Sequence, residues 1–336
     1  MPHFPQQFPA HRPRRNRKSD ALRQLVAEHH LTAHDLLAPV FVEEGTGQPT
    51  AIASMPGVQR YPLQHLPDHL AQLQSAGIRG ILLFAKIAEE KKDNNGTEAL
   101  NPEGLLPRAI RAAKAAAPDL LVMTDVALDP FSSYGHDGIV EDGEILNDRS
   151  VELLAQMSLV HARAGADLVA PSDMMDGRIG AIRRTLNDAH FSNTGIMSYA
   201  AKYASAFYGP FRDALDSAPG FGDKKTYQMH PANRAEALRE TALDLQEGAD
   251  LVMVKPGLPY LDIVREVKSS FQVPTAVYQV SGEYAMQHAA AAKGWLNLEE
   301  VMLESLLCFK RAGADLIATY FALPAAQWLQ ANGGAL

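Results

Sequence analysis

One lysine of the chain stands where an amine could act as a nucleophile. Lys255 closes the apolar run LVMVK (251–255), and Pro256 and Gly257 follow it at once. An apolar run with β-branched residues that stops at Pro-Gly is typical of a strand buried on both faces. A lysine at the exit of such a strand is partly desolvated, which lowers its pKa and favours the neutral amine that attacks carbonyls. The alternative is a lysine that only reaches from a strand end into solvent.

The segments around this lysine alternate between two patterns. Short apolar runs predict strands, and amphipathic runs between them predict helices. Eight strands within about 300 residues favour a (β/α)₈ barrel, of the TIM-barrel type, over a doubly wound sheet, because VEEGTG (42–47) is not the glycine-rich turn that the latter usually carries. The predicted strands are 36–42, 77–85, 119–128, 166–172, 194–202, 249–255, 274–281 and 314–321. The predicted helices are 66–77, 104–117, 145–165, 177–189, 231–248, 261–271 and 297–313.

Three of these helix-to-strand joints share one motif. They read AGADLVAP (164–171), EGADLVMV (247–254) and AGADLIAT (312–319). Glycine is the usual residue just after the end of a helix, and Ala-Asp then opens each buried run. We expect three equivalent joints on the bottom face of the barrel, where they serve stability.

Polar residues collect at the other ends of the predicted strands, which is the rim where a barrel carries its catalytic residues. Lys202 and Lys255 end neighbouring strands, and two close ammonium groups lower each other's pKa. An amine-based mechanism is therefore favoured. The loops 130–138 and 203–225 are expected to close over this rim. The other rim residues are Asp125 at the end of the third strand with Asp129 and Asp137 in the loop after it, Ser172, Asp173 and Asp176 at the end of the fourth, Ser281 at the end of the seventh and Tyr320 at the end of the eighth.

Composition limits the remaining possibilities. The formal net charge is −8, so no overall basic field favours nucleic acid. The exception is the basic run HRPRRNRK (11–18), which we interpret as part of a solvated arm or a subunit contact over residues 1–35, ahead of a catalytic domain at 36–336.

Cys308 is the single cysteine, which excludes an intrachain disulfide and a multi-cysteine zinc site. No run of about twenty apolar residues predicts a membrane span, and the N-terminus lacks a signal peptide.

Five segments carry a resemblance to a known family. They are TDVALDPFSSYGHDG (124–138), APSDMMDGR (170–178), SYAAKYASAFYGPFRDA (198–214), VMVKPGLPYLD (252–262) and YQVSGEYAM (278–286). In these segments, and over nearly its whole length, the chain resembles porphobilinogen synthase, also called 5-aminolevulinate dehydratase. The resemblance implies condensation of two 5-aminolevulinate molecules to porphobilinogen, with loss of two waters, in tetrapyrrole (heme or chlorophyll) synthesis.

The matched positions imply roles for individual residues. Lys255, within VKPG, corresponds to the Schiff-base lysine for the substrate that supplies the propionate side of the pyrrole. Lys202, within SYAAKYAS, corresponds to the lysine that forms an imine with the second substrate. The carboxylate-binding positions are Ser281 and Tyr320 for the first substrate, and Arg212 and Lys224 for the second. Further substrate-binding candidates are Asp125, which could orient groups or move protons, with Asp129, Ser172, Tyr208 and Gln228.

The metal is where the chain departs from part of the family. Zinc-dependent members carry three cysteines after the third strand, and the matching positions here are Ala127, Asp129 and Asp137. Carboxylates suit magnesium better than zinc, so we expect the zinc-free, magnesium-responsive type. Whether the two aspartates hold an ion or only tune the lysines stays open. The family's allosteric Mg²⁺ site corresponds to Glu240, which without the resemblance is an ordinary solvated helix charge.

The resemblance also implies a homo-octamer built from dimers, in which the arm wraps around a neighbouring barrel. The expected location is the cytoplasm, or the plastid stroma in a eukaryote. Two alternatives stay open: a Schiff-base aldolase that uses Lys255 alone on the same fold, and a non-catalytic barrel that acts as a scaffold. Paired Lys202, the aspartate-bearing loop and Ser281 argue against the aldolase.

Overall fold

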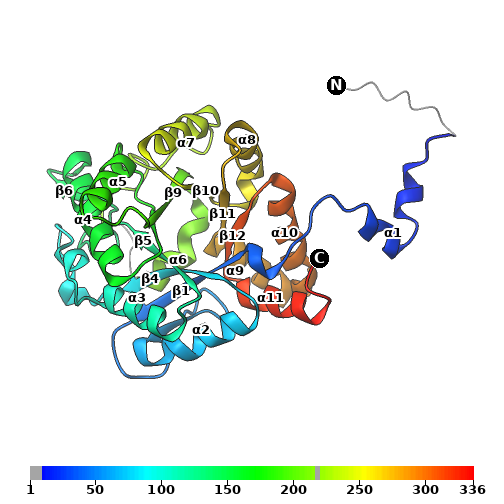
Figure 1. Cartoon of the computed structure of the whole chain (residues 1–336), viewed down its shortest axis with the longest axis horizontal. Coiled ribbons are helices and arrows are strands. Elements are labelled where there is room, and N and C mark those ends of the chain that lie inside the picture. The colour runs from blue at the N-terminus through cyan, green and yellow to red at the C-terminus, as the bar shows by residue number, and fades with distance from the viewer. Residues whose placement is uncertain (1–9, 216–219) are drawn as a thin grey trace.

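The centre of the molecule is a closed barrel of eight parallel strands (Figure 1). The computed structural model describes residues 10–215 and 220–336. Strand β1 pairs with β4 on one side and with β12 on the other, which closes the ring. The predicted barrel is therefore confirmed. Its strands are β1 (Leu36–Glu43), β4 (Gly80–Lys86), β5 (Leu121–Val126), β8 (Leu168–Pro171), β9 (Gly195–Lys202), β10 (Leu251–Lys255), β11 (Thr275–Gln279) and β12 (Leu316–Thr319).

Helices surround the barrel and bury their apolar faces against it. Each of the seven predicted helices is present, with ends that differ by a few residues. They are α2 (Leu66–Ser75), α3 (Leu105–Ala116), α4 (Asn147–Ala164), α5 (Arg178–Asp188), α7 (Ala235–Glu247), α8 (Leu261–Phe271) and α10 (Leu298–Ala312). The sequence did not predict α6 (Gly209–Leu215), α9 (Ser281–Ala292), α11 (Ala322–Ala331), or the short strands β2 (Thr50–Ala51), β3 (Gln59–Pro62), β6 (Ile139–Glu141) and β7 (Glu144–Leu146).

One predicted strand boundary was wrong. The seventh strand was placed at 274–281, with Ser281 at its exit, but β11 ends at Gln279 and Ser281 is the first residue of α9. The reason is a cap: the carboxylate of Glu283 accepts a hydrogen bond from the Val280 backbone N–H at 2.7 Å. An acidic residue at this position, bonded back to the helix start, favours a helix immediately after the strand.

The three repeated joints adopt one structure at the bottom of the barrel. Gly165, Gly248 and Gly313 end their helices with φ of 105°, 109° and 112°, a conformation in which glycine avoids the Cβ clash. The aspartate two residues later accepts a backbone N–H from the first or second residue of the neighbouring strand, at 2.7–2.8 Å in all three cases. Each aspartate also pairs with one cation: Asp167 with Lys114, Asp250 with Arg183, and Asp315 with Lys268.

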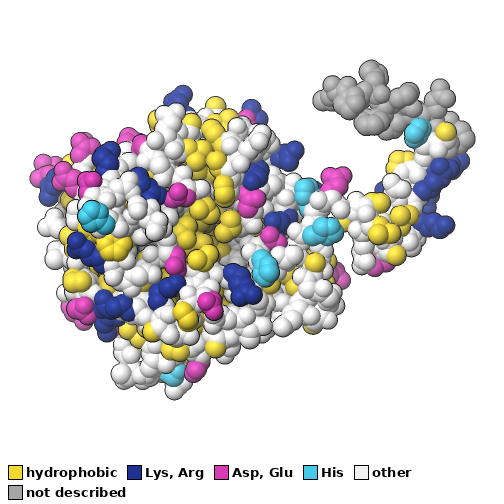
Figure 2. Space-filling model, in the orientation of Figure 1, with side chains coloured by type: hydrophobic (Ala, Val, Ile, Leu, Met, Phe, Trp, Pro, Cys, Tyr) yellow, Lys and Arg dark blue, Asp and Glu magenta, His cyan; other side chains and the backbone are white. Residues whose placement is uncertain are grey.

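The N-terminal arm lies away from the barrel in Figure 1. Its helix α1 (Asp20–Leu25) is capped by Ser19, whose hydroxyl accepts the Leu22 N–H at 3.3 Å. Lys and Arg side chains gather along it (Figure 2). The arm leaves the barrel at Leu31, which exchanges two backbone hydrogen bonds of 3.0 Å with Leu336. Residues 1–9 of the predicted arm lie outside the described part.

In the described part of the chain, none of the helices has the length and apolar character needed to cross a membrane.

Candidate active site

Strands β9 and β10 place two lysines side by side at the catalytic rim. Lys202 and Lys255 are directly paired Cα positions of the two parallel strands. Both are 6% exposed. Both strands are mostly apolar and buried in the barrel, and the last residue of each, a lysine, lies at the rim. The fold therefore brings together the two amines that the sequence predicted as neighbours.

Aromatic rings surround the amine of Lys255. The nearest is the ring of Tyr278, whose centroid lies 4.5 Å from Nζ. Across residues 10–215 and 220–336, no hydrogen bond joins this amine to another group. Burial and then the Lys202 ammonium lower the pKa of Lys255 to about 7, against the opposing effect of nearby carboxylates. A substantial fraction is therefore the neutral, nucleophilic amine near neutral pH. The other rings within 5.1–5.4 Å belong to Tyr199, Tyr208 and Phe211.

Lys202 has a polar environment instead. Its Nζ donates to Asp137 Oδ2 at 3.2 Å and to the backbone carbonyl of Ser172. Lys224 Nζ reaches the other Asp137 oxygen at 2.6 Å and Asp129 Oδ2 at 3.2 Å. Burial alone would raise the pKa of Asp137, but the two ammonium groups hold it below its ordinary value. Two lysines and two aspartates thus form one buried charge network beside Lys255.

Asp125 lies beneath this network, one residue before the end of β5. It is 7% exposed. Burial and the neighbouring Asp129 carboxylate raise the pKa of Asp125 to about 7, although Lys255 and the Ser172 hydroxyl oppose the shift. Asp125 and Lys255 therefore titrate in the same pH range, so the carboxyl group can hold a proton when the amine does not. A proton carrier of this kind suits imine chemistry.

A cavity of about 40 Å³ opens above the two amines. Ser281 is fixed at its edge, since its Oγ accepts the Phe211 N–H at 2.9 Å. Tyr320 is held by a hydroxyl–hydroxyl hydrogen bond of 3.0 Å to Tyr278. The predicted site residues that line the cavity are Asp129, Lys202, Tyr208, Arg212, Lys224, Gln228, Lys255, Ser281 and Tyr320. Asp125 and Ser172 lie near the lysines but do not line it.

The loops 130–138 and 203–225 lie beside this cavity, and the second lines it with Tyr208, Arg212 and Lys224. Residues 216–219 lie outside the described part. That the loops close over the cavity stays a prediction. The loops contact each other: Gly220 N–H donates to the Tyr134 carbonyl at 2.9 Å, and His136 shares a hydrogen bond of 3.1 Å with the Tyr227 hydroxyl. Lys225, by contrast, pairs with Asp223 at the surface, where 68% of its side chain is exposed. The loops therefore deliver Asp137 and Lys224, but not Lys225, to the site.

Comparison with known proteins decides the family. The family model described as Delta-aminolevulinic acid dehydratase matches residues 10–328. The chain belongs to the delta-aminolevulinic acid dehydratase family. It is 54% identical over 323 residues to the chloroplastic enzyme of Physcomitrium patens, covering 96% of this chain and 74% of the relative. It is also 54% identical to the enzyme of Bradyrhizobium diazoefficiens, covering 96% of this chain and 92% of the relative.

A solved structure gives the same result. The Toxoplasma gondii delta-aminolevulinic acid dehydratase, in complex with the reaction product porphobilinogen, superposes with a TM-score of 0.95 at 50% identity. The match covers 98% of this chain and 93% of that one. The chain is thus a lyase with porphobilinogen synthase activity. The activity predicted from the sequence is confirmed, and the aldolase and scaffold alternatives fall away.

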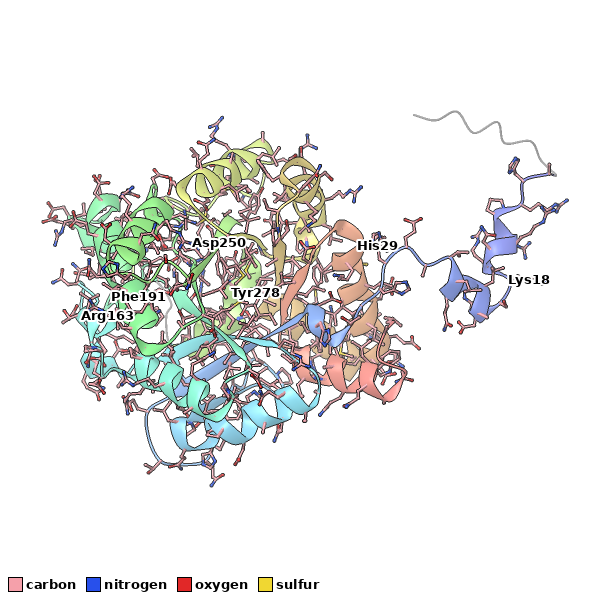
Figure 3. All side chains as sticks on the ribbon, viewed as in Figure 1. Lys18, His29, Arg163, Phe191, Asp250 and Tyr278 are labelled. Atoms are coloured by element: carbon pink, nitrogen blue, oxygen red, sulfur yellow. The ribbon has the colours of Figure 1, made fainter. Side chains whose placement is uncertain are left out.

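Sequence reasoning missed part of this delta-aminolevulinic acid dehydratase site. Phe211, Tyr278 and Val280 line the cavity, and Tyr199 packs against Lys255. Figure 3 labels Tyr278 near the middle of the barrel. A signal was present: Tyr278 is the one aromatic residue of the strand TAVYQ (275–279), placed one residue before its end. Nothing in the sequence alone showed that its ring turns toward the lysine on the neighbouring strand.

Glu240 lies outside the catalytic cavity. It is half-buried on α7 and lines a larger hollow of about 890 Å³ together with Asp176 and Glu236. Burial, and then Asp244 and Asp176, raise the pKa of Glu240. Arg178 opposes this shift. In the described part of the chain, Glu240 makes no hydrogen bond or ion pair.

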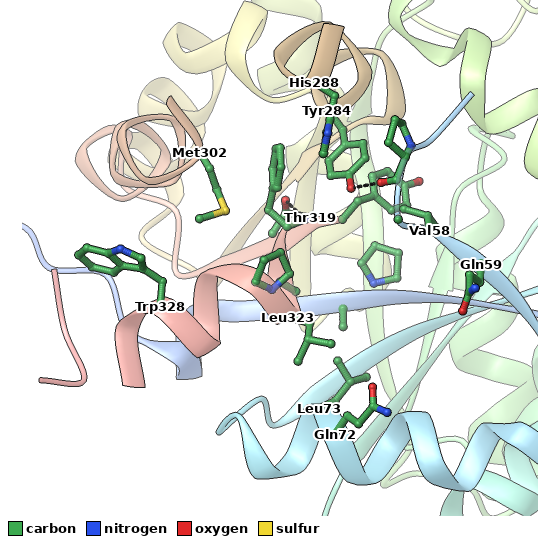
Figure 4. Close-up of a pocket in the computed structure, with 18 of the residues that line it drawn as sticks. Val58, Gln59, Gln72, Leu73, Tyr284, His288, Met302, Thr319, Leu323 and Trp328 are labelled. Carbon is green, nitrogen blue, oxygen red and sulfur yellow. Dashed lines mark hydrogen bonds between the residues drawn. The ribbon is translucent and has the colours of Figure 1, made fainter. Parts of the chain in front are cut away.

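Another hollow, of about 720 Å³, lies on the flank of the barrel between α2, α9 and α11 (Figure 4). Its wall is mainly apolar and aromatic, with Tyr284, His288 and Trp328 among its residues. Tyr284 donates a hydrogen bond to the Pro56 carbonyl across it. Among the described residues, neither lysine nor arginine lines this hollow, and Tyr320 lines both it and the catalytic cavity.

Proposed function

We propose that both lysines act as amines in the porphobilinogen synthase reaction, each forming a Schiff base with one 5-aminolevulinate molecule. The observation that carries this is the pairing of Lys202 with Lys255 on adjacent strands in two different environments. Lys255, ringed by aromatics, attacks a ketone as the neutral amine. The carbinolamine then loses water when a proton reaches its hydroxyl, and we assign the supply of that proton to Asp125 on the strength of its raised pKa beside Lys255.

Lys202 would act on the second substrate. Its ammonium donates to Asp137, so the carboxylate can take the proton that Lys202 must lose before it attacks. Each imine would form with release of one water. Loss of a proton from the carbon next to one imine would give an enamine, whose attack on the imine carbon at the other lysine would form the carbon–carbon bond. Elimination would release that lysine as the free amine, and transimination by a substrate amino group would release the other. The two lysines hold the substrates close together, which converts a reaction between two molecules into one within a single complex.

The substrate carboxylates are assigned to the cavity's polar wall. We propose that the hydroxyls of Ser281 and Tyr320 bind the carboxylate of the substrate on Lys255. Arg212 and Lys224 bind that of the second substrate, with Tyr208 and Gln228 beside them. Since Lys224 is bonded to Asp129 and Asp137 in this structure, it has to exchange at least one of these partners for the substrate.

Two measurements test these roles. Wild-type protein incubated with 5-aminolevulinate should give a positive colour reaction for a pyrrole, and borohydride reduction should add substrate mass to Lys255. Lys255→Met should remove the label from this peptide. Lys202→Met should leave Lys255 labelled but stop pyrrole formation. Unlabelled Lys255 in an active wild type would overturn the assignment.

The zinc-free type is also a proposal. Two observations support it: Ala127 offers no metal ligand, and the carboxylates of Asp129 and Asp137 already bind the Lys224 ammonium. We infer that these aspartates tune the lysines rather than hold zinc. A zinc-selective chelator should leave turnover within about two-fold of its starting value. Strong inhibition together with loss of bound zinc would contradict this.

Glu240 is proposed to hold an allosteric Mg²⁺ outside the active site, with Asp176 and Glu236 nearby. The ion would supply positive charge to carboxylates that lack a cation, while keeping most of its waters. Glu240→Ala should remove stimulation by added Mg²⁺ and retain basal turnover. Direct Mg²⁺ binding, measured by calorimetry, should be lost in the same variant. An unchanged magnesium response would reject the site.

We further propose a homo-octamer of dimers, located in the cytoplasm or the plastid stroma. The support is the arm, which leaves Leu25 83% and Val26 49% exposed. Such apolar side chains favour burial against another surface. Deletion of residues 1–30 should reduce the mass measured by light scattering. An unchanged mass would show that the arm does not build the assembly.

A further inference from the structure

One buried carboxylate next to the catalytic cavity touches neither lysine. Glu283, the third residue of α9, is 0% exposed. Its Oε2 accepts the backbone N–H of Val280 at 2.7 Å and that of Gly257 at 3.1 Å, and its Oε1 accepts the N–H of Leu258 at 2.6 Å. Three backbone donors therefore converge on this one side chain.

These donors belong to two different strand exits. Gly257 and Leu258 follow Lys255 at the end of β10, whereas Val280 directly precedes Ser281 after β11. The two strands are hydrogen-bonded neighbours up to the pair Val254 and Val277. Beyond that pair the strand ladder stops, and the carboxylate of Glu283 takes over as the link between the two exits.

A helix cap accounts for only part of this arrangement. An acidic residue at the third helical position commonly bonds back to the start of its own helix, which explains the Val280 contact. The contacts to Gly257 and Leu258 reach another element. No ion pair neutralises Glu283 within the described chain, and burying a carboxylate without a cation is costly. Stability alone would be served as well by an exposed cap such as Asn297 of α10, whose Oδ1 accepts the N–H groups of Glu299 and Glu300. Glu300, the third residue of α10, is exposed and makes no such bond with its own carboxylate in the described part of the chain.

The segment held by Glu283 has little room to shift. A Cβ on Gly257 would come within 2.6 Å of the Phe309 ring and 3.0 Å of the Tyr278 carbonyl. Glycine is therefore required where the chain passes between these groups. The Glu283 carboxylate binds the backbone N–H groups of Gly257 and Leu258, and the Phe309 ring packs against Gly257. Together these contacts restrain the backbone directly after Lys255.

We propose that Glu283 is a positioning residue that fixes the Lys255 amine relative to the Ser281 hydroxyl. With these two groups held apart at a constant distance, a single keto acid can present its carbonyl to the amine and its carboxylate to the hydroxyl. This inference rests on the proposed roles of Lys255 and Ser281. Glu283 itself does not touch the substrate.

The test compares Glu283→Gln with Glu300→Gln in the full-length protein. Glutamine keeps the shape of the side chain but turns one acceptor oxygen into a donor, which opposes a backbone N–H. We expect the rate of borohydride labelling of Lys255 by 5-aminolevulinate to fall by roughly 10²-fold per folded molecule, because small displacements of reacting groups cost rates of that order. kcat should fall in parallel at saturating substrate, and Glu300→Gln should match the wild type.

Glu283→Asp provides a second variant if the glutamine protein does not fold. It keeps the carboxyl group but is shorter by one methylene. Its labelling rate should therefore fall below that of the wild type, by less than the roughly 10²-fold expected for Glu283→Gln. A labelling rate equal to wild type, per folded molecule of either variant, would overturn the positioning role alone. A wild type that shows no labelling of Lys255 would overturn the proposed Schiff base and the inference with it.

Discussion

The two ends of the barrel use aspartates in opposite ways. At the bottom, Asp167, Asp250 and Asp315 each bind one cation and one strand N–H, and their side chains stay 28%, 52% and 42% exposed. At the top, Asp125 and Asp129 are 7% exposed, and Asp137 is 1% exposed.

The difference in burial explains the difference in role. An ion pair of a carboxylate near water contributes only a modest amount to the free energy of unfolding. A buried carboxylate depends on its neighbours for its charge, so its protonation is linked to theirs. The pKa of Asp125 is raised by burial and by the Asp129 carboxylate. The pKa of Asp137 is lowered by the Lys202 and Lys224 ammonium groups. The bottom aspartates link neighbouring strands, and the top aspartates raise the pKa of Lys224 and oppose the lowering of the pKa of Lys255.

Removing the amine of Lys255 should give the largest loss of activity without a loss of stability. Lys255→Met deletes the nucleophile, so we expect kcat to fall by roughly 10⁴-fold or more. The same change removes a buried ammonium that costs free energy to desolvate, so the free energy of unfolding should stay equal or rise. Urea denaturation and a pyrrole assay measure the two quantities. A clear loss of stability would mean that the aromatic rings stabilise the ammonium more than burial destabilises it.

Asp137→Asn should lower both the free energy of unfolding and kcat. Lys202 and Lys224 would be left buried without their shared anion, and breaking a buried ion pair typically costs about 3–5 kcal/mol. We expect roughly 10²-fold lower kcat, the order of a lost proton-transfer partner. Asp137 also raises the pKa of Lys255, so the pH profile of the residual activity should move to lower pH. A profile at the wild-type position would show that Asp137 does not act on Lys255.

The wild-type pH dependence follows from Lys255. Below a pKa of about 7 the amine is protonated, so kcat/KM should fall about tenfold per pH unit on the acid side, before other groups titrate. Stability should change in the same direction. Between pH 7 and about 10.5 the unfolded lysine binds a proton and the folded one does not, so this residue's contribution to stability rises with pH. Lys255→Met should lack that contribution, which denaturation at pH 7 and pH 9 would reveal.

The smallest effect is expected at the bottom. Asp250→Asn removes the ion pair with Arg183 and weakens the hydrogen bond from the Ile196 N–H. The free energy of unfolding should fall by about 1–2 kcal/mol, while kcat per folded molecule stays unchanged. Asp167 and Asp315 offer the same substitution as internal replicates. A changed kcat in any of them would show that the two ends of the barrel are coupled.

The parallel-strand arrangement made the site largely predictable. Once the alternating elements indicated a barrel, the strand-end rule placed Lys202, Lys255 and Asp125 on one rim, and the structure agrees. Side-chain partners across the rim were not predictable in this way, because the direction of Tyr278 depends on packing against neighbouring strands. Helix α9 was missed because it begins at Ser281, inside the run YQVS that was assigned to the strand, so no loop separates the two elements. Its alanine-rich run AMQHAAAAK (285–293) was a usable helix signal.

The hydrogen bonds between Leu31 and Leu336 have a practical consequence. They hold Leu336 next to Leu31, where the arm joins the barrel, at the bottom of the barrel and on the side away from the two lysines. A fluorescent label or affinity tag attached after Leu336 would therefore sit beside the root of the arm. Such a probe should sense movements of the arm during assembly and leave the entrance to the catalytic cavity clear.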